Sequence, residues 1–261
     1  MRFVESPDNP AYRQLRRLCQ SGRERRKTGF SVLDGMHLLT AYEERFQKVR
    51  ELFVSEAARD KPEIAAYLAA SAGIKQTVLS ERLFEDLGLV DTPTGIVGLI
   101  NTPVPAAGPD AQGDAVLLDG VQDPGNLGSI LRSAAAAGFR QVLLSADCAQ
   151  AWAPKTLRAG QGAHFQTVIH ENQDLCAFLA GYGGKAAVTC LGAQGDLFDA
   201  DLRGPVAWVF GSEGQGVRPA VLALTNAPLA IPMPGGSESL NVAAAAAICL
   251  FETVRQRQNV G

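Results

Sequence analysis

Short apolar runs alternate with amphipathic segments through residues 1–101. The apolar runs predict strands at 52–55, 77–79 and 95–100. The helically spaced segments predict helices at 9–22, 62–72 and 81–87. The first helix is expected to have Asn9 as its N-cap and Pro10 at its first position, and to stop at Gly22. This alternation predicts a small N-terminal α/β sandwich.

A second and more regular alternation begins after residue 113. Its apolar runs predict buried strands at 115–119, 141–144, 167–169, 186–190 and 206–210. Helices are expected at 126–137, from near 154, at 173–181 and at 239–258. Apolar strands that alternate with helices are typical of a mostly parallel sheet covered by helices on both faces. Ligands of such sheets bind beyond the carboxyl ends of the strands.

The two patterns are separated by residues 102–113, which contain three prolines and two glycines and have no periodicity. Such a composition is typical of a linker. We therefore expect an N-terminal α/β domain at 1–101, a linker at 102–113 and a larger α/β domain at 114–261.

Charge is distributed unevenly over the chain. The formal net charge of −3 argues against a protein that binds nucleic acid by its overall charge alone. Residues 2–27, however, contain eight basic and three acidic residues. Such a segment can hold phosphates through counterion release, although a solvated helix face has the same composition. The sequence leaves both interpretations open.

Membrane insertion and metal binding have little support in the sequence. The longest apolar run, at 242–251, is far shorter than the roughly 20 residues of a membrane span. The N-terminus lacks the apolar core of a signal peptide, so a soluble cytoplasmic protein is expected. The five cysteines are scattered and the three histidines lack zinc-ligand spacing. We expect buried free thiols and no metal site.

A first candidate site follows the strand at 115–119, where a polar loop opens the next helix. Asn126 is suited to cap that helix, and free backbone N–H groups there attract anions. Gly128 and Arg132 are four residues apart on one helix face, so the glycine leaves room beside the guanidinium. An arginine in that position can grip a phosphate with two hydrogen bonds. A capped helix with a surface arginine is the structural alternative.

A second candidate site is the glycine-rich segment at 209–217. Three glycines and Glu213 directly follow an apolar strand, where the backbone can turn sharply and approach a flat ligand. The order GxxGxG differs from the GxGxxG of a dinucleotide site, and no P-loop lysine is present. A simple structural turn is the alternative.

A third segment, at 231–242, leads into an alanine-rich helix. Ser237 or Ser239 can cap this helix, which places Asn241 in its first turn. The small residues at 243–247 allow close packing against another helix or a partner subunit.

Taken together and in order, the three segments resemble the SpoU/TrmH family of the SPOUT methyltransferases over residues 115–257. The matching motifs are Asn-x-Gly-x-x-x-Arg at 126–132, Gly-x-Glu-Gly-x-Gly at 211–216, and Ile-Pro-Met followed by Ser-Leu-Asn-Val within 231–242. Three motifs in the family's order make chance agreement improbable. The N-terminal part is similar to the small substrate-binding domain that often precedes this catalytic domain.

The resemblance implies an S-adenosylmethionine-dependent methyltransferase that acts on a ribose 2′-hydroxyl of RNA. It also implies a C-terminal sheet tied into a trefoil knot, and a homodimer whose active sites lie at the subunit interface. Contacts to the cofactor are implied for four residues of the second and third segments: Gly211, Ile231, Met233 and Leu240.

The resemblance also assigns catalytic roles. Arg132 matches the residue regarded in the family as the catalytic arginine. Because arginine normally stays protonated, we interpret it as the group that positions the ribose-phosphate and stabilises negative charge on the reacting oxygen. Whether it also accepts the proton stays open. Four further residues are implied to fix the hydroxyl and the arginine by hydrogen bonds: Asn126, Glu213, Ser239 and Asn241.

Alternatives from other functional classes remain at this point. A Rossmann oxidoreductase needs an ordered glycine fingerprint after its first strand, and residues 119–126 do not supply one. A non-catalytic RNA-binding protein on the same scaffold is expected to lose Arg132 or the Asn241 motif, and both are present. Transfer RNA is the alternative substrate. Ribosomal RNA is favoured because the separate N-terminal domain resembles the ribosomal RNA enzymes more closely.

Overall fold

The computed structural model describes residues 1–89, 94–190, 192–236 and 238–258. The chain divides into two compact units. The first unit consists of Met1–Pro103 and Trp152–Phe165, and the second consists of Val104–Ala151 and Gln166–Gly261.

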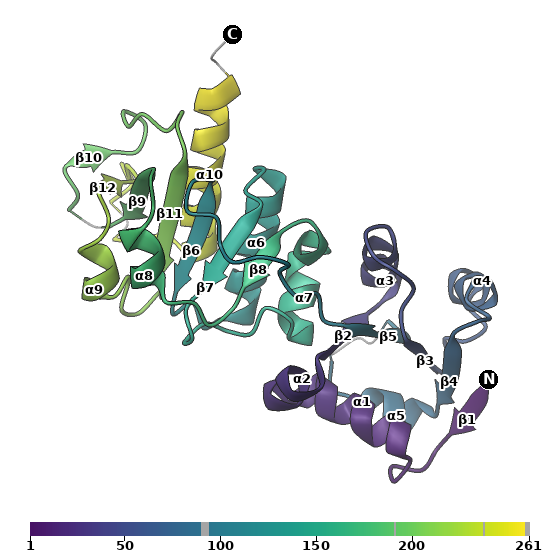
Figure 1. Ribbon diagram of the computed structural model, residues 1–261. Coiled ribbons are helices and arrows are strands. Elements are labelled where there is room, and N and C mark those ends of the chain that lie inside the picture. The colour runs from purple at the N-terminus through teal and green to yellow at the C-terminus, as the bar shows by residue number, and fades with distance from the viewer. Residues whose placement is uncertain (90–93, 191, 237, 259–261) are drawn as a thin grey trace. The chain divides into compact units, whose positions relative to one another are not determined.

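The first unit is built on a five-stranded sheet in the order β1-β4-β3-β5-β2. Its strands are β1 (Arg2–Val4), β2 (Phe30–Asp34), β3 (Glu51–Ser55), β4 (Lys75–Leu79) and β5 (Ile96–Asn101). Strand β5 is antiparallel to β2 and β3, and the other neighbours are parallel. The helices are α1 (Pro10–Gln20), α2 (Gly22–Thr28), α3 (Met36–Glu43), α4 (Pro62–Ala70), α5 (Glu81–Glu85) and α7 (Pro154–Gly160), with a 3-10 turn at Ala163–Phe165. Figure 1 shows α1 and α5 on one face of this sheet and α3 and α4 on the other, which confirms the expected sandwich.

Helix α1 forms where capping and periodicity agree. The side chain of Asn9 accepts hydrogen bonds from two backbone N–H groups of the first turn, and Pro10 occupies the first helical position. The expected start of this helix is therefore confirmed. Tyr12, Leu15 and Leu18 recur at helical spacing and are buried in the core of the first unit.

The end of α1 differs from the expected stop at Gly22. Gly22 is the first residue of α2, and Ser21 both closes α1 and caps α2 by accepting a hydrogen bond from the backbone N–H of Glu24 at 3.2 Å. A glycine after a helical pattern normally marks a C-terminus. Here the serine before it starts a second helix, which is too polar to be recognised by apolar periodicity.

The segment Trp152–Phe165 belongs to the first unit, although the residues on either side of it belong to the second. Helix α7 packs against β2, and the rings of Phe165 and Tyr42 meet edge to face with centroids 5.5 Å apart. Arg158 pairs with the buried carboxylate of Asp34 at 3.6 Å. The continuous division at 1–101, 102–113 and 114–261 did not foresee these contacts, because they join residues far apart in sequence. Those boundaries stay a prediction.

Within the described residues, the second unit is built on seven strands, all parallel, in the order β10-β12-β9-β11-β6-β7-β8. The strands are β6 (Ala115–Asp119), β7 (Gln141–Leu144), β8 (Val168–His170), β9 (Lys185–Thr189), β10 (Gly195–Asp196), β11 (Val206–Gly211) and β12 (Ala227–Ala230). The helices are α6 (Pro124–Ala136), α8 (Leu175–Ala180), α9 (Pro219–Leu222) and α10 (Val242–Gln258). The expected mostly parallel sheet is confirmed. The short elements β10, β12 and α9 were not expected.

Helices cover both faces of this sheet (Figure 1). On one face, α8 and α9 bury Leu175, Leu179 and Val221 in the core. On the other, α10 packs against α6 and β11. The indole N–H of Trp208 on β11 donates to Thr253 Oγ1 on α10 at 3.0 Å, so this buried polar group is satisfied.

The register of the central strands positions the loops that follow them. Strands β6 and β11 are neighbours, and Asp119 is paired with Gly211 at their carboxyl ends. Two of the expected site segments therefore start side by side, at the edge where parallel sheets bind ligands.

The start of α6 differs from the sequence prediction. The helix begins at Pro124 and is capped by Asp123, whose carboxylate accepts from the backbone N–H of Asn126 at 2.7 Å. The expected cap at Asn126 is wrong, because an aspartate followed directly by proline is the stronger start signal. The side chain of Asn126 is thereby left for other contacts.

The start of α10 also lies later than expected. The helix begins at Val242, and Asn241 Oδ1 accepts from two backbone N–H groups of the first turn at 3.0 and 3.3 Å. Asn241 is therefore the capping residue. Ser239 lies ahead of the helix, and Ser237, the other expected cap, is outside the described residues.

Candidate functional site

Three polar side chains from segments far apart in sequence meet in the second unit. Asn126 Nδ2 donates a hydrogen bond to Glu213 Oε1 at 2.7 Å. Asn241 Nδ2 donates to the same carboxylate oxygen at 2.8 Å and to Asn126 Oδ1 at 3.0 Å. The structure therefore brings three of the expected catalytic residues together, and we name Asn126, Glu213 and Asn241 the polar triangle.

Hydrogen bonds fix the orientation of each member of the polar triangle. Because Asn241 Oδ1 caps α10, its amide N–H groups point to the other two members. Glu213 Oε1 accepts two N–H donors, whereas no described residue donates to the other oxygen of this carboxylate. That oxygen can accept a hydrogen bond from a hydroxyl group of a ligand, which is how a carboxylate orients and activates a hydroxyl.

The loop that carries Glu213 closes on itself directly after β11. Ser212 and Gly216 form an antiparallel bridge with N···O distances of 2.9 and 3.2 Å. A Cβ at Gly211 would lie 2.1 Å from the carbonyl carbon of Gly216, so no side chain fits there. Gly216 has a φ of 67°, in the region that favours glycine. The loop is thus a narrow hairpin whose bare backbone is available to a ligand.

A buried carboxylate anchors the end of this loop. The side chain of Asp119, at the end of β6, is 1% exposed. It accepts hydrogen bonds from the backbone N–H of Arg218 at 2.8 Å and from the Arg218 guanidinium at 2.7 Å. These charge-assisted hydrogen bonds between the buried Asp119 and the half-exposed Arg218 hold the loop to the neighbouring strand. This pair was not predicted from the sequence, in which its local signal is a carboxylate at the end of an apolar strand.

The loop forms part of the wall of a cavity of about 710 Å³. The four residues expected to contact a cofactor all line it: Gly211, Ile231, Met233 and Leu240. Glu213, Ser239 and Asn241 line it too, so two members of the polar triangle border the cavity.

The chemistry of the cavity fits a nucleoside-containing cofactor. Its volume lies within the roughly 300–1,000 Å³ of small-molecule sites. Val188, Phe210 and Leu222 supply apolar wall, and the glycine loop supplies backbone N–H and C=O groups. A flat base needs the first kind of surface, and its polar edge needs the second. The cavity therefore fits the cofactor that the family resemblance implies.

Arg132 is the expected catalytic residue that the structure does not join to the others. It is exposed on α6, and it has no hydrogen-bond or ion-pair partner among the described residues. It does not line the cavity. Because Asn126 lies six residues earlier on the same helix, the two side chains are not on one face. The guanidinium is thus open to a ligand or to a second chain.

Other kinds of site find no support in the part of the chain that is described. No group of three His, Cys, Asp or Glu side chains there is placed to hold a metal ion. No helix there combines the length and the hydropathy needed to cross a membrane. Burial raises the pKa of the Cys19 thiol to about 12, and it also raises the pKa of the Cys249 thiol. Neither cysteine is therefore suited to act as a nucleophile.

Comparison with known proteins agrees with this geometry. Residues 114–251 match the SpoU rRNA Methylase family, and residues 9–98 match the MRM3-like substrate binding domain. The 23S rRNA (guanosine(2553)-2′-O)-methyltransferase RlmP of Bacillus subtilis is 32% identical over 253 residues, which cover 96% of this chain and 98% of that protein.

Solved structures give the same result. The SpoU methyltransferase AviRb from Streptomyces viridochromogenes, in complex with the cofactor AdoMet, has a TM-score of 0.86 at 26% identity and covers 96% of this chain and 99% of its own. An AdoMet-bound rRNA methyltransferase from Sinorhizobium meliloti has a TM-score of 0.81 at 28% identity and covers 97% of each chain. The chain therefore belongs to the SpoU rRNA methylase family and has its SPOUT fold.

Proposed function

We propose that this protein transfers a methyl group from S-adenosylmethionine to a ribose 2′-hydroxyl of ribosomal RNA. One observation carries the proposal. Glu213 and Asn241 belong both to the polar triangle and to the lining of the cavity beside the glycine loop. A donor in the cavity and a hydroxyl held by the triangle are thereby adjacent. RlmP is a 23S rRNA 2′-O-methyltransferase and AviRb is known in complex with AdoMet, and both support the same substrate and donor.

The glycine loop and the segment that precedes α10 would hold the cofactor in the cavity. Gly211 would allow backbone to come close to the ligand, and Ile231, Met233 and Leu240, which line the same cavity, would contact it. When bound, the cofactor supplies an activated methyl group on a sulfonium. The protein therefore has to align the acceptor oxygen and stabilise the charge that develops on it.

The acceptor hydroxyl is oriented by the polar triangle. The Glu213 oxygen to which no described residue donates accepts a hydrogen bond from the hydroxyl and takes up its proton as the new O–C bond forms, while Asn126 and Asn241 hold the carboxylate in place. Ser239, at the edge of the same cavity, adds a hydroxyl group to this environment. Orientation of this kind can contribute about 7–11 kcal/mol to lowering a reaction barrier.

Arg132 holds the phosphate next to the reacting ribose. Its exposed guanidinium can form two parallel hydrogen bonds with phosphate oxygens. In the same position it stabilises negative charge on the 2′-oxygen as the methyl group is transferred. Because arginine normally stays protonated, positioning and charge stabilisation are its main contributions.

A homodimer supplies, from a second chain, the neighbouring active-site groups that Arg132 does not contact among the described residues of its own chain. One face of α10 is exposed or half-buried and mostly apolar, with Ala244, Ala247, Ile248 and Phe251 at helical spacing. Phe251 is 48% exposed, and with these neighbours it forms a contiguous apolar surface of the kind that a second chain covers. The second copy thus packs on α10 and completes the active site. The trefoil knot and a cytoplasmic location are part of the same proposal.

The N-terminal domain, at 1–101, binds the RNA substrate. Its match to a substrate binding domain and the basic composition of residues 2–27 support this role. The linker at 102–113 joins it to the methyltransferase domain at 114–261.

Mapping of ribose methylation tests this function most broadly. Ribosomal RNA from cells that lack the protein should contain one ribose 2′-hydroxyl that is methylated in the parent cells and unmethylated in theirs. The purified protein and S-adenosylmethionine should restore the methyl group at that position. A product that resists alkaline cleavage at that nucleotide identifies the 2′-oxygen as the acceptor. Methylation of transfer RNA in its place would establish the alternative substrate, and binding of RNA with no methyl transfer would establish the non-catalytic alternative.

A further inference from the structure

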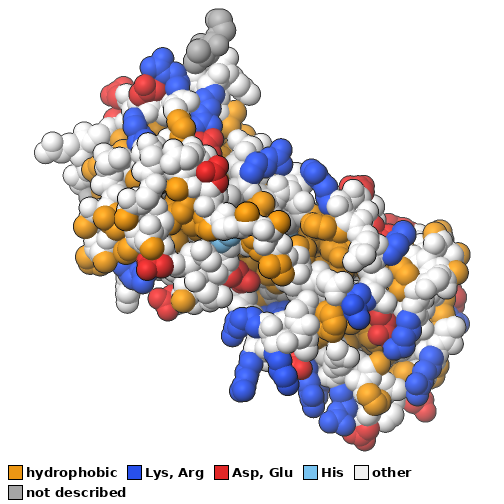
Figure 2. Space-filling view, in the orientation of Figure 1, with side chains coloured by type: hydrophobic (Ala, Val, Ile, Leu, Met, Phe, Trp, Pro, Cys, Tyr) orange, Lys and Arg blue, Asp and Glu red, His pale blue; other side chains and the backbone are white. Residues whose placement is uncertain are grey.

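Helices α1 and α2 carry most of the basic residues of the N-terminal segment. Figure 2 shows Lys and Arg side chains gathered over α2 and the adjoining part of α1. Six of these side chains are exposed in the structure: Arg13, Arg16, Arg17, Arg23, Arg26 and Lys27. The cluster therefore forms a surface, and the sequence alone could not separate its binding residues from its structural ones.

Two basic residues of the segment have structural partners. Arg25 is buried and donates to the backbone carbonyls of Leu18 at 2.6 Å and Cys19 at 3.4 Å. Arg16 pairs with Asp86 at 3.0 Å. Because Arg25 ties α2 to the last turn of α1, it fixes the corner between the two helices. The remaining basic side chains are thus presented on a rigid support.

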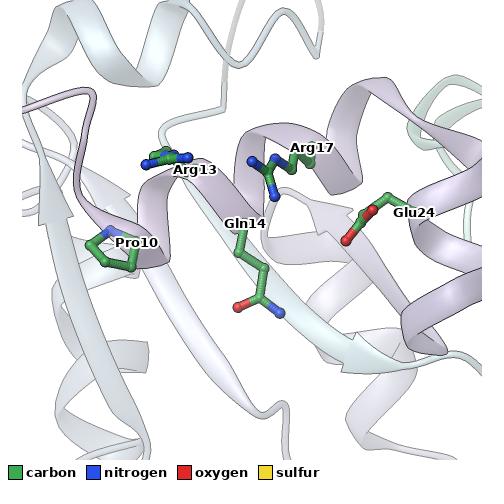
Figure 3. A pocket seen from close by; sticks show the side chains of 5 residues that line it. All are labelled: Pro10, Arg13, Gln14, Arg17 and Glu24. Carbon is green, nitrogen blue, oxygen red and sulfur yellow. The ribbon is translucent and has the colours of Figure 1, made fainter.

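A groove of about 400 Å³ lies at this corner. It is lined by Pro10, Arg13, Gln14, Arg17 and Glu24. Figure 3 shows Arg13, Gln14 and Arg17 projecting from α1, with the carboxylate of Glu24 directed toward them from α2. The described residues provide no ion pair or hydrogen bond for the side chain of Arg13 or Arg17. Two guanidinium groups and an amide are therefore available to one ligand.

The spacing of the two arginines favours an extended anion with more than one charge. Arg13 and Arg17 are four residues apart, so they share one face of α1, opposite the buried face that carries Leu15 and Leu18. Guanidinium groups recognise phosphate with two parallel hydrogen bonds each. Adjacent phosphates of one nucleic-acid strand match such a pair, and the Gln14 amide can donate to a phosphate or sugar oxygen between them.

We infer that the α1–α2 groove is a subsite for the sugar-phosphate backbone of the RNA substrate. The inference rests on the proposed function, because it assigns the groove to the same RNA that the second unit methylates. Arg13 and Arg17 bind phosphates there, and Arg25 acts only as a positioning residue. Glu24 weakens the binding by charge repulsion and so limits how tightly the RNA is held. Contacts of this kind are independent of base sequence and depend strongly on salt.

The central test compares the double variant Arg13→Gln/Arg17→Gln with the wild-type protein. The dissociation constant for a ribosomal RNA fragment is measured at several salt concentrations between about 50 and 200 mM. In this range, affinity that depends on phosphate contacts falls steeply with salt. Affinity should fall about tenfold, and the slope of log K against log salt should become shallower by about 2, since each lost phosphate contact removes about 1. The control variant Arg45→Gln/Lys61→Gln removes two exposed charges from the same unit and should leave the slope almost unchanged.

A variant that gains RNA affinity rules out unfolding as the explanation for altered RNA binding. The variant Glu24→Gln should bind the same RNA about threefold more tightly, because it removes a like charge from the groove. A damaged protein cannot give that result. Unchanged or weaker binding by Glu24→Gln would count against the groove, as would a double variant with wild-type affinity and salt slope.

The experiments distinguish a wrong assignment of the groove as an RNA subsite from a wrong assignment of the methyltransferase function. The double variant should still bind S-adenosylmethionine with wild-type affinity, whereas its KM for RNA should rise in step with the loss of RNA affinity. If the wild-type protein binds RNA through the groove but transfers no methyl group, the proposed function is wrong, whereas the assignment of the groove as an RNA-binding subsite is supported. If the wild-type protein methylates RNA and the double variant does so with unaltered RNA affinity, the groove alone is wrong.

Discussion

Replacing Arg132 by alanine is expected to lower kcat for RNA methylation by about 10²–10³-fold, the usual effect of losing one preorganised donor that stabilises developing charge. The affinity for S-adenosylmethionine should not change, because Arg132 does not line the cofactor cavity. The substitution should not destabilise the fold, because the side chain is exposed and has no partner among the described residues. Single-turnover methyl transfer measures the first effect, and calorimetric titration of the cofactor measures the second.

Two further variants sharpen this prediction. Arg132→Lys keeps the positive charge but loses the planar pair of donors, so it should recover only part of the activity if phosphate is held by two hydrogen bonds. Arg140→Ala removes an exposed arginine of the same unit and should retain wild-type turnover. Wild-type turnover by Arg132→Ala would remove the arginine from the mechanism.

Replacing Gly211 by alanine is expected to weaken S-adenosylmethionine binding by about 10- to 100-fold, if the added methyl group costs about 1–3 kcal/mol as overpacking usually does. The new Cβ would lie within 2.1–2.3 Å of backbone atoms of Gly216 and Val217. Backbone cannot move aside as a flexible side chain can, so the hairpin has to open. Methylation should fall in parallel, and calorimetric titration with the cofactor gives the affinity directly.

The matched control for this prediction is Gly204→Ala in the same unit. A Cβ there meets nothing within 4 Å, and Gly204 is not among the residues that line the cavity. Its cofactor affinity should therefore equal that of the wild-type protein. Equal affinities for Gly211→Ala and Gly204→Ala would show that the tight hairpin does not matter for cofactor binding.

Much of the fold could be predicted because its strands are short, apolar and separated by breaker residues. Strand β7 lies at 141–144 as expected, and the Asn9–Pro10 start of α1 is confirmed. Elements without such signals were missed. Helix α2 is polar almost throughout and is defined by the Ser21 cap and by Gly29 in the left-handed region. Strand β10, at Gly195–Asp196, is too short to show a pattern.

The helix caps show how competing local signals mislead a reading of the sequence. Asn126 and Ser239 both precede helical patterns, and each is a good capping residue in isolation. In the structure, Asp123 caps α6 and Asn241 caps α10, so Asn126 is released to join the polar triangle. Both true caps lie within a few residues of the expected ones. At α6 the choice is made by the Asp123–Pro124 pair, a local start signal that hydrophobic periodicity does not contain.

The candidate site could be assembled from the sequence only through the order of its motifs. Asn126, Glu213 and Asn241 are far apart in the chain, and no propensity places them within hydrogen-bond distance. The parallel register that pairs Asp119 with Gly211 brings the first two segments together. The Asp119–Arg218 pair was not foreseen, because both partners look ordinary in their local sequence. Contacts across the sheet are set by topology, which a local pattern leaves undetermined.

Methyl transfer at this site depends most on where the methyl donor binds and which groups its methyl faces. A crystal structure of the protein with S-adenosylmethionine and an RNA fragment tests this directly. We expect the cofactor in the cavity lined by Gly211, Ile231 and Leu240, with its methyl group directed at a ribose oxygen that contacts Glu213. A cofactor bound elsewhere, or a ribose oxygen held away from both the polar triangle and Arg132, would contradict the account.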